Sequence, residues 1–354
     1  MWNGPNPGPG PRPDSPKPPT IRGVAERAGV SKSLVSLVLQ GSPRVSPGKR
    51  QAVLEAIEEL GYRPNAAARS LSEQRTRTVG VLLNDMRNPW FVELLDGLNS
   101  LLHANGLHML LSDGRLNQRT GEGLTRTFLE LRVDGFVAVG TMADPSAIAE
   151  AAQRVPTVVA AAREPALPHL DVVAGDDERG ARLATEHLIG LGHRRIAHIT
   201  GLGLVGELRR RSFEATMRRQ GLAGSMVVEP SDTTEEGGYR ATVRLLSGPA
   251  RPTAIFAFND IACVGALSAA GELGLEVPRD LSLVGYDNTY LSRIRHLWLN
   301  TVDNASYEVG RRAAQCLLDR MEQPGRPGGV QLVNPTLEIR GSTAAPHADP
   351  PDRP

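Results

Sequence analysis

The stretch AERAGVSKSLVSLVLQG, residues 25–41, predicts two short helices joined by a tight corner. Gly29 is a natural stop for the first helix, and Ser31 is a favoured cap for the second. The second helix opens on polar residues, whereas its apolar residues recur at helical spacing. These apolar residues are Leu34, Val35, Val38 and Leu39. Such a corner exposes the start of the second helix.

The flanking residues extend this pattern to three helices. Residues 20–28 predict a helix capped by Thr20, and residues 45–61 predict one with Ser46 as cap, Pro47 at the first helical position and Gly61 as its end. Their apolar faces are Ile21, Val24, Ala25 and Ala28 in the first, and Val53, Ile57 and Leu60 in the third. Three short helices with a tight corner between the first two form a helix-turn-helix.

The exposed start of the second helix suits DNA. In a helix-turn-helix its N-terminal residues reach base edges in the major groove and must be polar or small, as are Ser31, Lys32, Ser33 and Ser36. Residues 19–78 contain ten Lys or Arg against five Glu, although the whole chain has a net charge of only +1. This asymmetry favours a polyanionic partner. A helical hairpin with a polar cap and a solvated basic surface is the alternative.

From residue 78 onward, short apolar strands alternate with helices, as in TVGVLL, GFVAVG, RIAHIT and AIFAFN. Continuous apolar strands indicate parallel sheets covered on both faces. About 265 residues of this pattern exceed one doubly wound domain. We expect two α/β subdomains, with strands starting near residues 79, 107, 135 and 157 in the first and near 195, 225, 253 and 281 in the second.

Composition narrows the class of protein. No apolar run reaches the ~18 residues of a membrane span, and the N-terminus lacks the apolar region of a signal peptide. Residues 1–18 and 343–354 read as disordered tails rich in Pro or Gly. Two cysteines, Cys263 and Cys316, fit the core of a protein in a reducing cytoplasm. No metal-ligand spacing or nucleophile motif occurs, so we expect no metal, cofactor or catalytic residue.

One motif favours a different class of protein, a dinucleotide-binding enzyme. GLGLVG, residues 201–206, fits G-x-G-x-x-G, follows a predicted strand and precedes a predicted helix, as a dinucleotide-binding loop does. Glu229 lies near the position at which an acidic residue would hold the ribose. An NAD-binding oxidoreductase is therefore the alternative. The position of the loop in mid-chain, behind a helix-turn-helix, tells against it.

Longer motifs carry a resemblance. TIRGVAERAGVSKSLVSLVLQG, LGYRPNAAARSL, VGVLLNDMRNPWF, EHLIGLGHRRIAHITG, FAFNDIACVGAL and DLSLVGYDN occur in this order. On these motifs the chain resembles the lactose/galactose repressor (LacI/GalR) family over residues 20–343. The resemblance implies a multidomain fold, with an all-α helix-turn-helix head and a two-lobed α/β domain like a periplasmic sugar-binding protein.

The resemblance also implies domain boundaries. They are a DNA-binding domain at 19–63, a hinge helix and linker at 64–77, and an effector-binding and dimerisation domain at 78–342. The chain would cross between the two lobes near residues 175, 303 and 328. Relatives that form tetramers carry a further C-terminal helix, which the prolines of STAAPHADPPDRP exclude. We therefore expect a homodimer.

The implied function is that of a cytoplasmic repressor that binds a pseudopalindromic operator and responds to a small molecule. Leu71 of the hinge helix would wedge between base steps in the minor groove. Leu37 stands where many relatives carry Arg, which leaves the operator sequence open. The implied DNA-binding residues are Thr20, Ser31, Lys32, Ser33, Ser36, Leu37, Arg44, Asn65, Ala68 and Leu71.

The resemblance places an effector in a cleft between the lobes. The implied effector-binding residues are Trp90, Phe91, Arg209, Asn259 with Asp260, and Asp287. By its position alone, in the basic run of Arg209, Arg210 and Arg211, Arg209 is more typical of a surface residue. A sugar, a polyol or a sugar phosphate is expected, but Ala161 replaces a usual polar sugar contact, so a purine stays open. We expect Arg209→Ala to leave the dimer folded and to abolish the ligand response.

Overall fold

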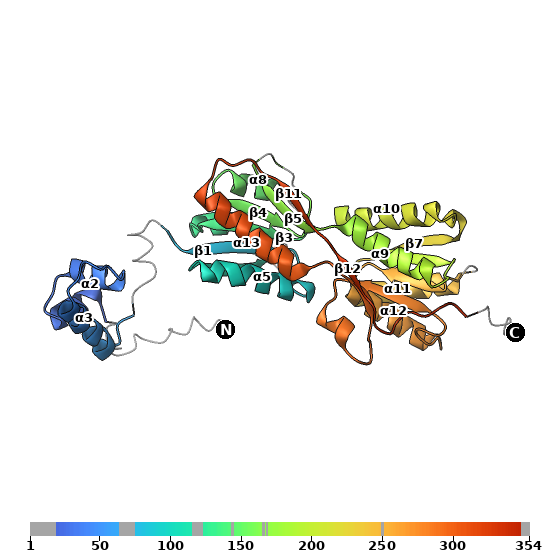
Figure 1. Cartoon of the computed structure of the whole chain (residues 1–354), viewed down its shortest axis with the longest axis horizontal. Coiled ribbons are helices and arrows are strands. Elements are labelled where there is room, and N and C mark those ends of the chain that lie inside the picture. Colours follow the sequence, from blue (N-terminus) through green and yellow to red (C-terminus); the bar gives the residue numbers. More distant parts are fainter. Residues whose placement is uncertain are drawn as a thin grey trace, which may run out of the picture. The chain divides into compact units, whose positions relative to one another are not determined.

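The computed structural model describes residues 19–63, 75–114, 123–142, 145–164, 167, 169–248 and 251–347. The chain divides into two compact units, a helical unit up to Thr76 and an α/β unit from Arg77 onward (Figure 1). Three of the predicted DNA contacts, Asn65, Ala68 and Leu71, lie outside the described residues.

The helical unit contains the three predicted helices, α1 (Ile21–Arg27), α2 (Lys32–Leu39) and α3 (Pro47–Leu60). The hydroxyl of Thr20 accepts a hydrogen bond from the backbone N–H of Gly23 at 3.2 Å, and Ser31 caps α2 in the same way. Gly61 ends α3 in the left-handed conformation, with φ at 60°. Ser46 precedes α3 without a side-chain cap bond, and Pro47 occupies the first turn, where its missing N–H costs no helical hydrogen bond.

The core of the helical unit differs from the predicted apolar faces at two positions. Leu39 and Leu60 are 36% and 37% exposed. Each is the last residue of its helix, where no neighbouring helix covers it. The buried residues are Val24, Ala25, Val35, Val38, Val45, Val53 and Ala56.

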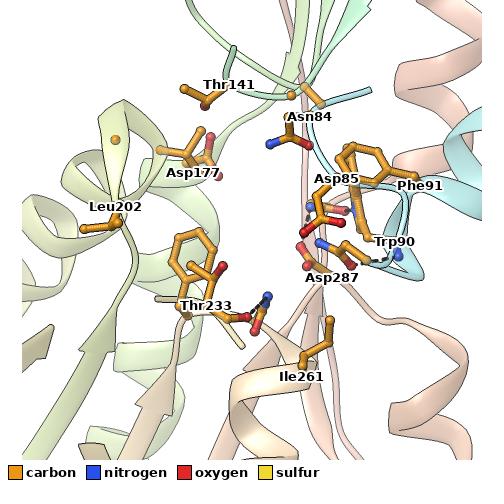
Figure 2. A pocket seen from close by; sticks show the side chains of 18 of the residues that line it. Asn84, Asp85, Trp90, Phe91, Thr141, Asp177, Leu202, Thr233, Ile261 and Asp287 are labelled. Atoms are coloured by element: carbon orange, nitrogen blue, oxygen red, sulfur yellow. Dashed lines mark hydrogen bonds between the residues drawn. The ribbon is translucent and has the colours of Figure 1, made fainter. Parts of the chain in front are cut away.

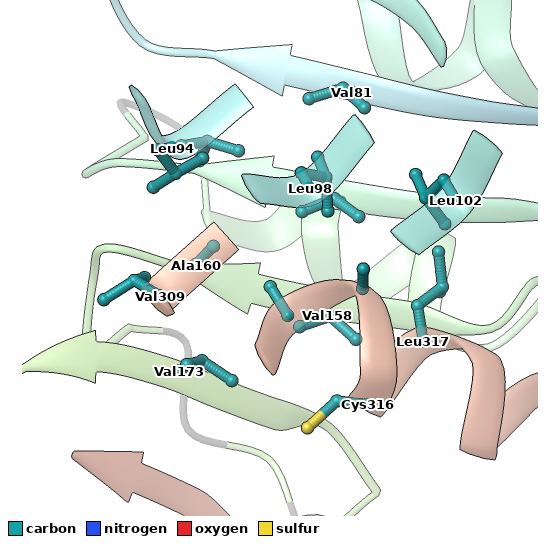
Figure 3. Close-up of a cluster of buried hydrophobic side chains, with 14 of the residues drawn as sticks. Val81, Leu94, Leu98, Leu102, Val158, Ala160, Val173, Val309, Cys316 and Leu317 are labelled. Atoms are coloured by element: carbon teal, nitrogen blue, oxygen red, sulfur yellow. The ribbon is translucent and has the colours of Figure 1, made fainter. Parts of the chain in front are cut away.

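The first lobe of the α/β unit is a six-stranded parallel sheet in the order β2-β1-β3-β4-β5-β11. Its strands are β1 (Thr78–Leu83), β2 (His108–Asp113), β3 (Gly135–Val139), β4 (Thr157–Ala160), β5 (Asp171–Gly175) and β11 (Val330–Val333). Its helices are α5 (Trp90–Ala104), α7 (Leu124–Glu130), α8 (Pro145–Ala152) and α13 (Ser306–Glu322). Helices α5 and α13 cover one face, where Leu94, Leu98 and Leu317 pack on Val81 and Val158 (Figure 3).

The second lobe repeats this architecture with the order β12-β10-β9-β8-β6-β7, in which only β12 is antiparallel. Its strands are β6 (Ile196–Thr200), β7 (Met226–Pro230), β8 (Ala254–Ala257), β9 (Ser282–Tyr286), β10 (Asn300–Asp303) and β12 (Thr336–Glu338). Its helices are α9 (Asp177–Gly190), α10 (Gly203–Arg219), α11 (Glu235–Ser247) and α12 (Asp260–Glu272), with short 3₁₀ turns η1 (Ala223–Ser225) and η2 (Tyr290–Arg293). The expectation of two α/β subdomains is confirmed.

The chain crosses between the lobes three times, at 175–177, 303–306 and 333–336. The third crossing lies beyond the expected position near 328, because residues 330–333 first add strand β11 to the first sheet beside β5. Neither β5 nor β11 was predicted as a strand. Figure 1 shows α13, which follows the second crossing, packed on the first lobe.

Glycines allow the closest helix pair in each lobe to touch. A Cβ on Gly97 of α5 would overlap the carbonyl oxygen of Tyr307, and one on Gly310 of α13 would overlap that of Leu94. In the second lobe, α11 and α12 approach in the same way through Gly238 and Gly265. Both predicted core cysteines, Cys263 on α12 and Cys316 on α13, are buried free thiols beside these contacts. Within the described ranges, no helix is long and apolar enough to cross a membrane.

Candidate functional site

A cavity of about 800 Å³ lies where the carboxyl ends of the two sheets meet. Both sheets have their topological switch point beside the first strand of the lobe, β1 or β6, and ligands of open α/β sheets bind at such points. The residues that follow strands and line the cavity include Asn84, Gly140, Ala161, Leu202, Phe258, Asp287 and Asn304. The volume is that of a small-molecule site. Figure 2 shows the side chains around the opening.

Arg209 lies in this cavity wall and not on the surface, with only 4% of the residue exposed. Its Nε and Nη2 each lie 2.9 Å from Oδ1 of Asp177, and its Nη1 donates to the carbonyl of Phe258 at 2.6 Å. Its guanidinium carbon lies 3.5 Å from the ring centre of Tyr286 and 4.6 Å from that of Phe258. A buried cation requires such compensation. We therefore no longer expect Arg209→Ala to leave the fold intact.

Asp287 directly follows β9 at the same wall, in a left-handed conformation with φ at 101°. Its Oδ1 accepts a hydrogen bond from Nδ2 of Asn304 at 3.0 Å and lies 4.0 Å from Nη2 of Arg209. Burial raises the pKa of Asp287 to about 7; Arg209 opposes this rise, and the carboxylates Asp260 and Asp177 add to it. A ligand that stabilises the carboxylate of Asp287 would therefore lower this pKa, and the carboxyl group would release its proton when that ligand binds.

The aromatic pair of the first lobe faces this wall. Trp90 and Phe91 open α5 and pack edge to face with ring centres 5.2 Å apart. The indole N–H of Trp90 donates to Oδ1 of Asn304 at 2.6 Å. Because Asn304 also binds Asp287 and sits on the second crossing, a chain of hydrogen bonds joins the first lobe to the second.

The other predicted cleft residues are engaged within the protein. Asn259 lines the cavity, but its Oδ1 caps α12 at the N–H of Ala262 and its Nδ2 donates to the carbonyl of Thr233. Asp260 is not among the lining residues; it is fully buried and accepts hydrogen bonds from Thr289 and Thr301. Burial raises the pKa of Asp260 to about 6. Ala161 lines the cavity and adds no polar contact.

Sequence reasoning missed Asp177 and Asn304. Asn304 directly follows β10, and Asp177 begins α9 two residues after the end of β5; each lies at a crossing between the lobes. The signal was present for Asp177 in DVVAGDD, an apolar run followed by two carboxylates, but β5 was not recognised as a strand. The position of Asn304 after the predicted strand LNTVD was an equivalent signal.

The glycines of the GLGLVG loop are explained by packing between a strand and a helix. Gly203 adopts a φ of 75°, and a Cβ on Gly206 would overlap the carbonyl oxygen of Gly201. These glycines let α10 start tightly against the end of β6. Glu229, the candidate ribose ligand, pairs instead with Arg244 at 2.6 Å. In the part of the chain that the structure describes, no group of three His, Cys, Asp or Glu could hold a metal.

The helical unit exposes the predicted DNA-contacting face of α2. Ser31, Lys32 and Ser33 are exposed at its start, Leu37 is 38% exposed on the next turn, and Ser36 is half-buried. Thr20, which caps α1, and Arg44, which follows α2, are also exposed. Among the described residues, Lys32 has no ion-pair partner. A polar, uncompensated start of a helix is available for an external partner.

Comparisons with known proteins agree with this division. Residues 20–65 match the model of bacterial regulatory proteins of the lacI family, and residues 185–343 match a periplasmic binding protein-like domain. Catabolite control protein A of Priestia megaterium is 33% identical over 329 residues, covering 92% of this chain and 99% of that protein.

Two solved structures are similar to the chain. The lac repressor dimer bound to operator and the anti-inducer ONPF aligns with a TM-score of 0.81 at 28% identity, over 93% of this chain and 100% of that one. A regulator from Enterococcus faecium, solved with bound ribose, aligns with a TM-score of 0.68 at 28% identity, over 76% of this chain and 99% of that one.

Proposed function

The chain belongs to the LacI family of bacterial regulatory proteins, and from that premise we propose that it is a repressor that binds a pseudopalindromic operator as a homodimer. It is a DNA-binding transcriptional regulator controlled by a small-molecule effector, and nothing supports an oxidoreductase. The dimeric, operator-bound state of the lac repressor supports the proposed assembly. The protein acts in the cytoplasm, where its DNA lies, and not as an enzyme.

The observation that carries this proposal is the exposed, polar start of α2 on a helical unit with its own core. Ser31, Lys32, Ser33, Ser36 and Leu37 enter the major groove, and Leu37 contacts a thymine methyl where a longer cation would contact guanine. Phosphate contacts come from Thr20, which caps α1, and from Arg44, which follows α2. Asn65, Ala68 and Leu71 remain predicted minor-groove contacts.

Lys32→Ala is expected to weaken binding to the specific operator by about 1–3 kcal/mol, the scale of one base contact. Binding to random DNA depends on phosphate contacts and should change less. Fluorescence anisotropy measures both affinities on an operator selected in vitro and on a scrambled duplex. Arg27→Ala is the control, because Arg27 pairs with Glu59 and has no role on the proposed DNA face. Equal losses on both duplexes would mean that Lys32 contacts only phosphate.

The effector occupies the cavity between the lobes, contacting Trp90, Phe91, Arg209, Asn259 and Asp287. The Trp90–Asn304–Asp287 chain supports this proposal, because a ligand bound there meets groups of both lobes and of a crossing. A ligand that binds one lobe arrangement better shifts the population and so the operator affinity.

Operator release across a panel of sugars tests the effector proposal. Thr141→Trp, which places a large ring in the cavity mouth, should abolish the response and keep the affinity for operator without ligand. A response unchanged in Thr141→Trp would place the effector elsewhere.

A further inference from the structure

The cavity wall at the second crossing consists of two layers of polar contacts. The inner layer faces the cavity and contains Trp90, Asn304 and Asp287, joined by the hydrogen bonds described above (Figure 2). Trp90 belongs to the first lobe, Asp287 to the second and Asn304 to the crossing between them. Three separate segments of the chain therefore meet at this wall.

The same three segments carry an outer layer, whose residues do not line the cavity. Oε1 of Glu93, on α5, accepts a hydrogen bond at 3.2 Å from Nη2 of Arg293, the last residue of η2. The same Nη2 donates to the carbonyl of Asn288 at 3.3 Å, and Nδ2 of Asn288 donates to Oδ2 of Asp303 at 2.8 Å. The hydroxyl of Ser306 donates to Oε2 of Glu93 at 3.3 Å. Because Asp303 and Ser306 belong to one crossing, these contacts form a closed ring.

The two layers cannot move independently, because their residues are neighbours along the chain. Asp287 of the inner layer precedes Asn288 of the outer layer, and both adopt left-handed conformations, with φ at 101° and 48°. Such angles restrict a residue with a side chain to a small region of backbone conformation. The side chain of Asn288 is held on a second side, because its Oδ1 accepts a hydrogen bond from Nη2 of Arg340. A displacement of Asp287 by a ligand is thus transmitted to Asn288 and on to Arg293.

The Glu93–Arg293 contact is the link of the ring that joins the two lobes directly and carries full charges. Its side chains are 40% and 51% exposed, so water and salt screen the attraction and the pair adds little to the stability of the fold. An equilibrium between two lobe arrangements is more sensitive, because small differences in free energy decide which arrangement is populated. A weak contact across the lobes is enough to bias it.

We propose that the Glu93–Arg293 ion pair is a latch between the lobes, which stabilises the described lobe arrangement and is loosened or tightened through the Asp287–Asn288 turn when the cavity is occupied. This inference rests on the proposed control of operator binding by the lobe arrangement, and it assigns that control to two residues that contact neither the cavity nor DNA.

Charge reversal on the full chain tests the latch. Glu93→Arg and Arg293→Glu each place two like charges across the lobes, whereas the double variant restores an ion pair of opposite polarity. The probes are ribose, cellobiose and hypoxanthine, and calorimetry gives their apparent Kd. An effector acts only on an equilibrium that does not already favour its own arrangement, so its apparent affinity follows any change in that equilibrium. Both single variants should change the apparent Kd of a bound probe in the same direction, by about threefold to tenfold, and the double variant should restore it to within about twofold.

Distances between spin labels report the lobe arrangement without any probe. Gln153→Cys on the first lobe and Ala215→Cys on α10 of the second provide exposed positions for the labels, and the native thiols of Cys263 and Cys316 are buried. The labelled chain is diluted with unlabelled chain, so that one protomer of a dimer carries both labels. The distance distribution should move in the same direction in both single variants and return in the double variant.

Asp96→Arg and Arg295→Glu are the matched controls, because they make the same changes of charge on α5 and just after η2. Both residues are exposed, and neither forms an ion pair with another described residue. The controls should change the apparent Kd by less than about twofold. At about 0.5 M NaCl the single variants should approach the wild type, because salt screens exposed charges, whereas a lost packing contact would not respond to salt.

Three results would overturn the latch: single variants with effects of opposite sign, single variants that match their controls, or a double variant that does not restore the wild-type values. If none of the three probes binds, the distances alone decide between these outcomes. A wild-type chain that binds no operator would overturn the proposed function, and the distances would still decide whether the latch exists.

Discussion

Arg209→Ala should destabilise the α/β unit by about 3–5 kcal/mol, the cost of leaving one partner of a buried ion pair without the other. Asp177 is 5% exposed and would lose the guanidinium that compensates its charge. The Phe258 carbonyl would lose its donor, and a cavity would open against Tyr286. Urea unfolding followed by tryptophan fluorescence measures the change in the free energy of unfolding.

Arg211→Ala is the matched control in the same run of arginines. Its side chain is 67% exposed and, among the described residues, pairs only with Glu207, so its removal should cost no more than about 1 kcal/mol. The double variant Arg209→Met with Asp177→Leu should recover part of the loss, because it leaves no buried charge. Equal costs for Arg209→Ala and Arg211→Ala would contradict the buried ion pair. If Arg209→Ala destabilises the fold as expected, loss of the ligand response in this variant reflects lost folding as well as a lost ligand contact.

Gly265→Ala should destabilise the second lobe by about 3 kcal/mol, near the upper range for overpacking. The added methyl group would overlap the carbonyl oxygen of Glu235 on α11, and backbone atoms cannot move aside as a flexible side chain can. Helices α11 and α12 would have to separate, which opens the core around Ala262 and Ala266. The measurement is the urea midpoint at constant m-value.

Gly271→Ala on the same helix is the control, because a Cβ there meets nothing within 4 Å. Alanine is the better helix former, so this variant should gain about 0.5–1 kcal/mol. The two substitutions are chemically identical and have opposite expected signs. A stabilising Gly265→Ala would mean that α11 and α12 do not approach each other as closely as described.

Local patterns predicted the parts of the fold that depend on local contacts. Thr20 and Ser31 cap their helices and Gly61 ends α3, because capping bonds span only about three residues and can be read from neighbours along the chain. The alternation of apolar strands with helices predicted both lobes for the same reason. Leu39 and Leu60 were misplaced because helical spacing does not indicate where a crossing helix ends.

By itself, the sequence determined the helix-turn-helix head, the two α/β lobes and some of the residues at the strand ends, but neither Asp177 nor Asn304. Only the tertiary structure decided which of those residues meet. Trp90 and Asn304 are 214 residues apart, and Arg209 lies 32 residues from Asp177. Periodicity and capping carry no information on such pairs. The second crossing brings Asn304 to Trp90, and the packing of α10 on α9 brings Arg209 to Asp177. Burial then decides the chemistry: it binds Arg209 to Asp177 and raises the pKa of Asp287 to about 7.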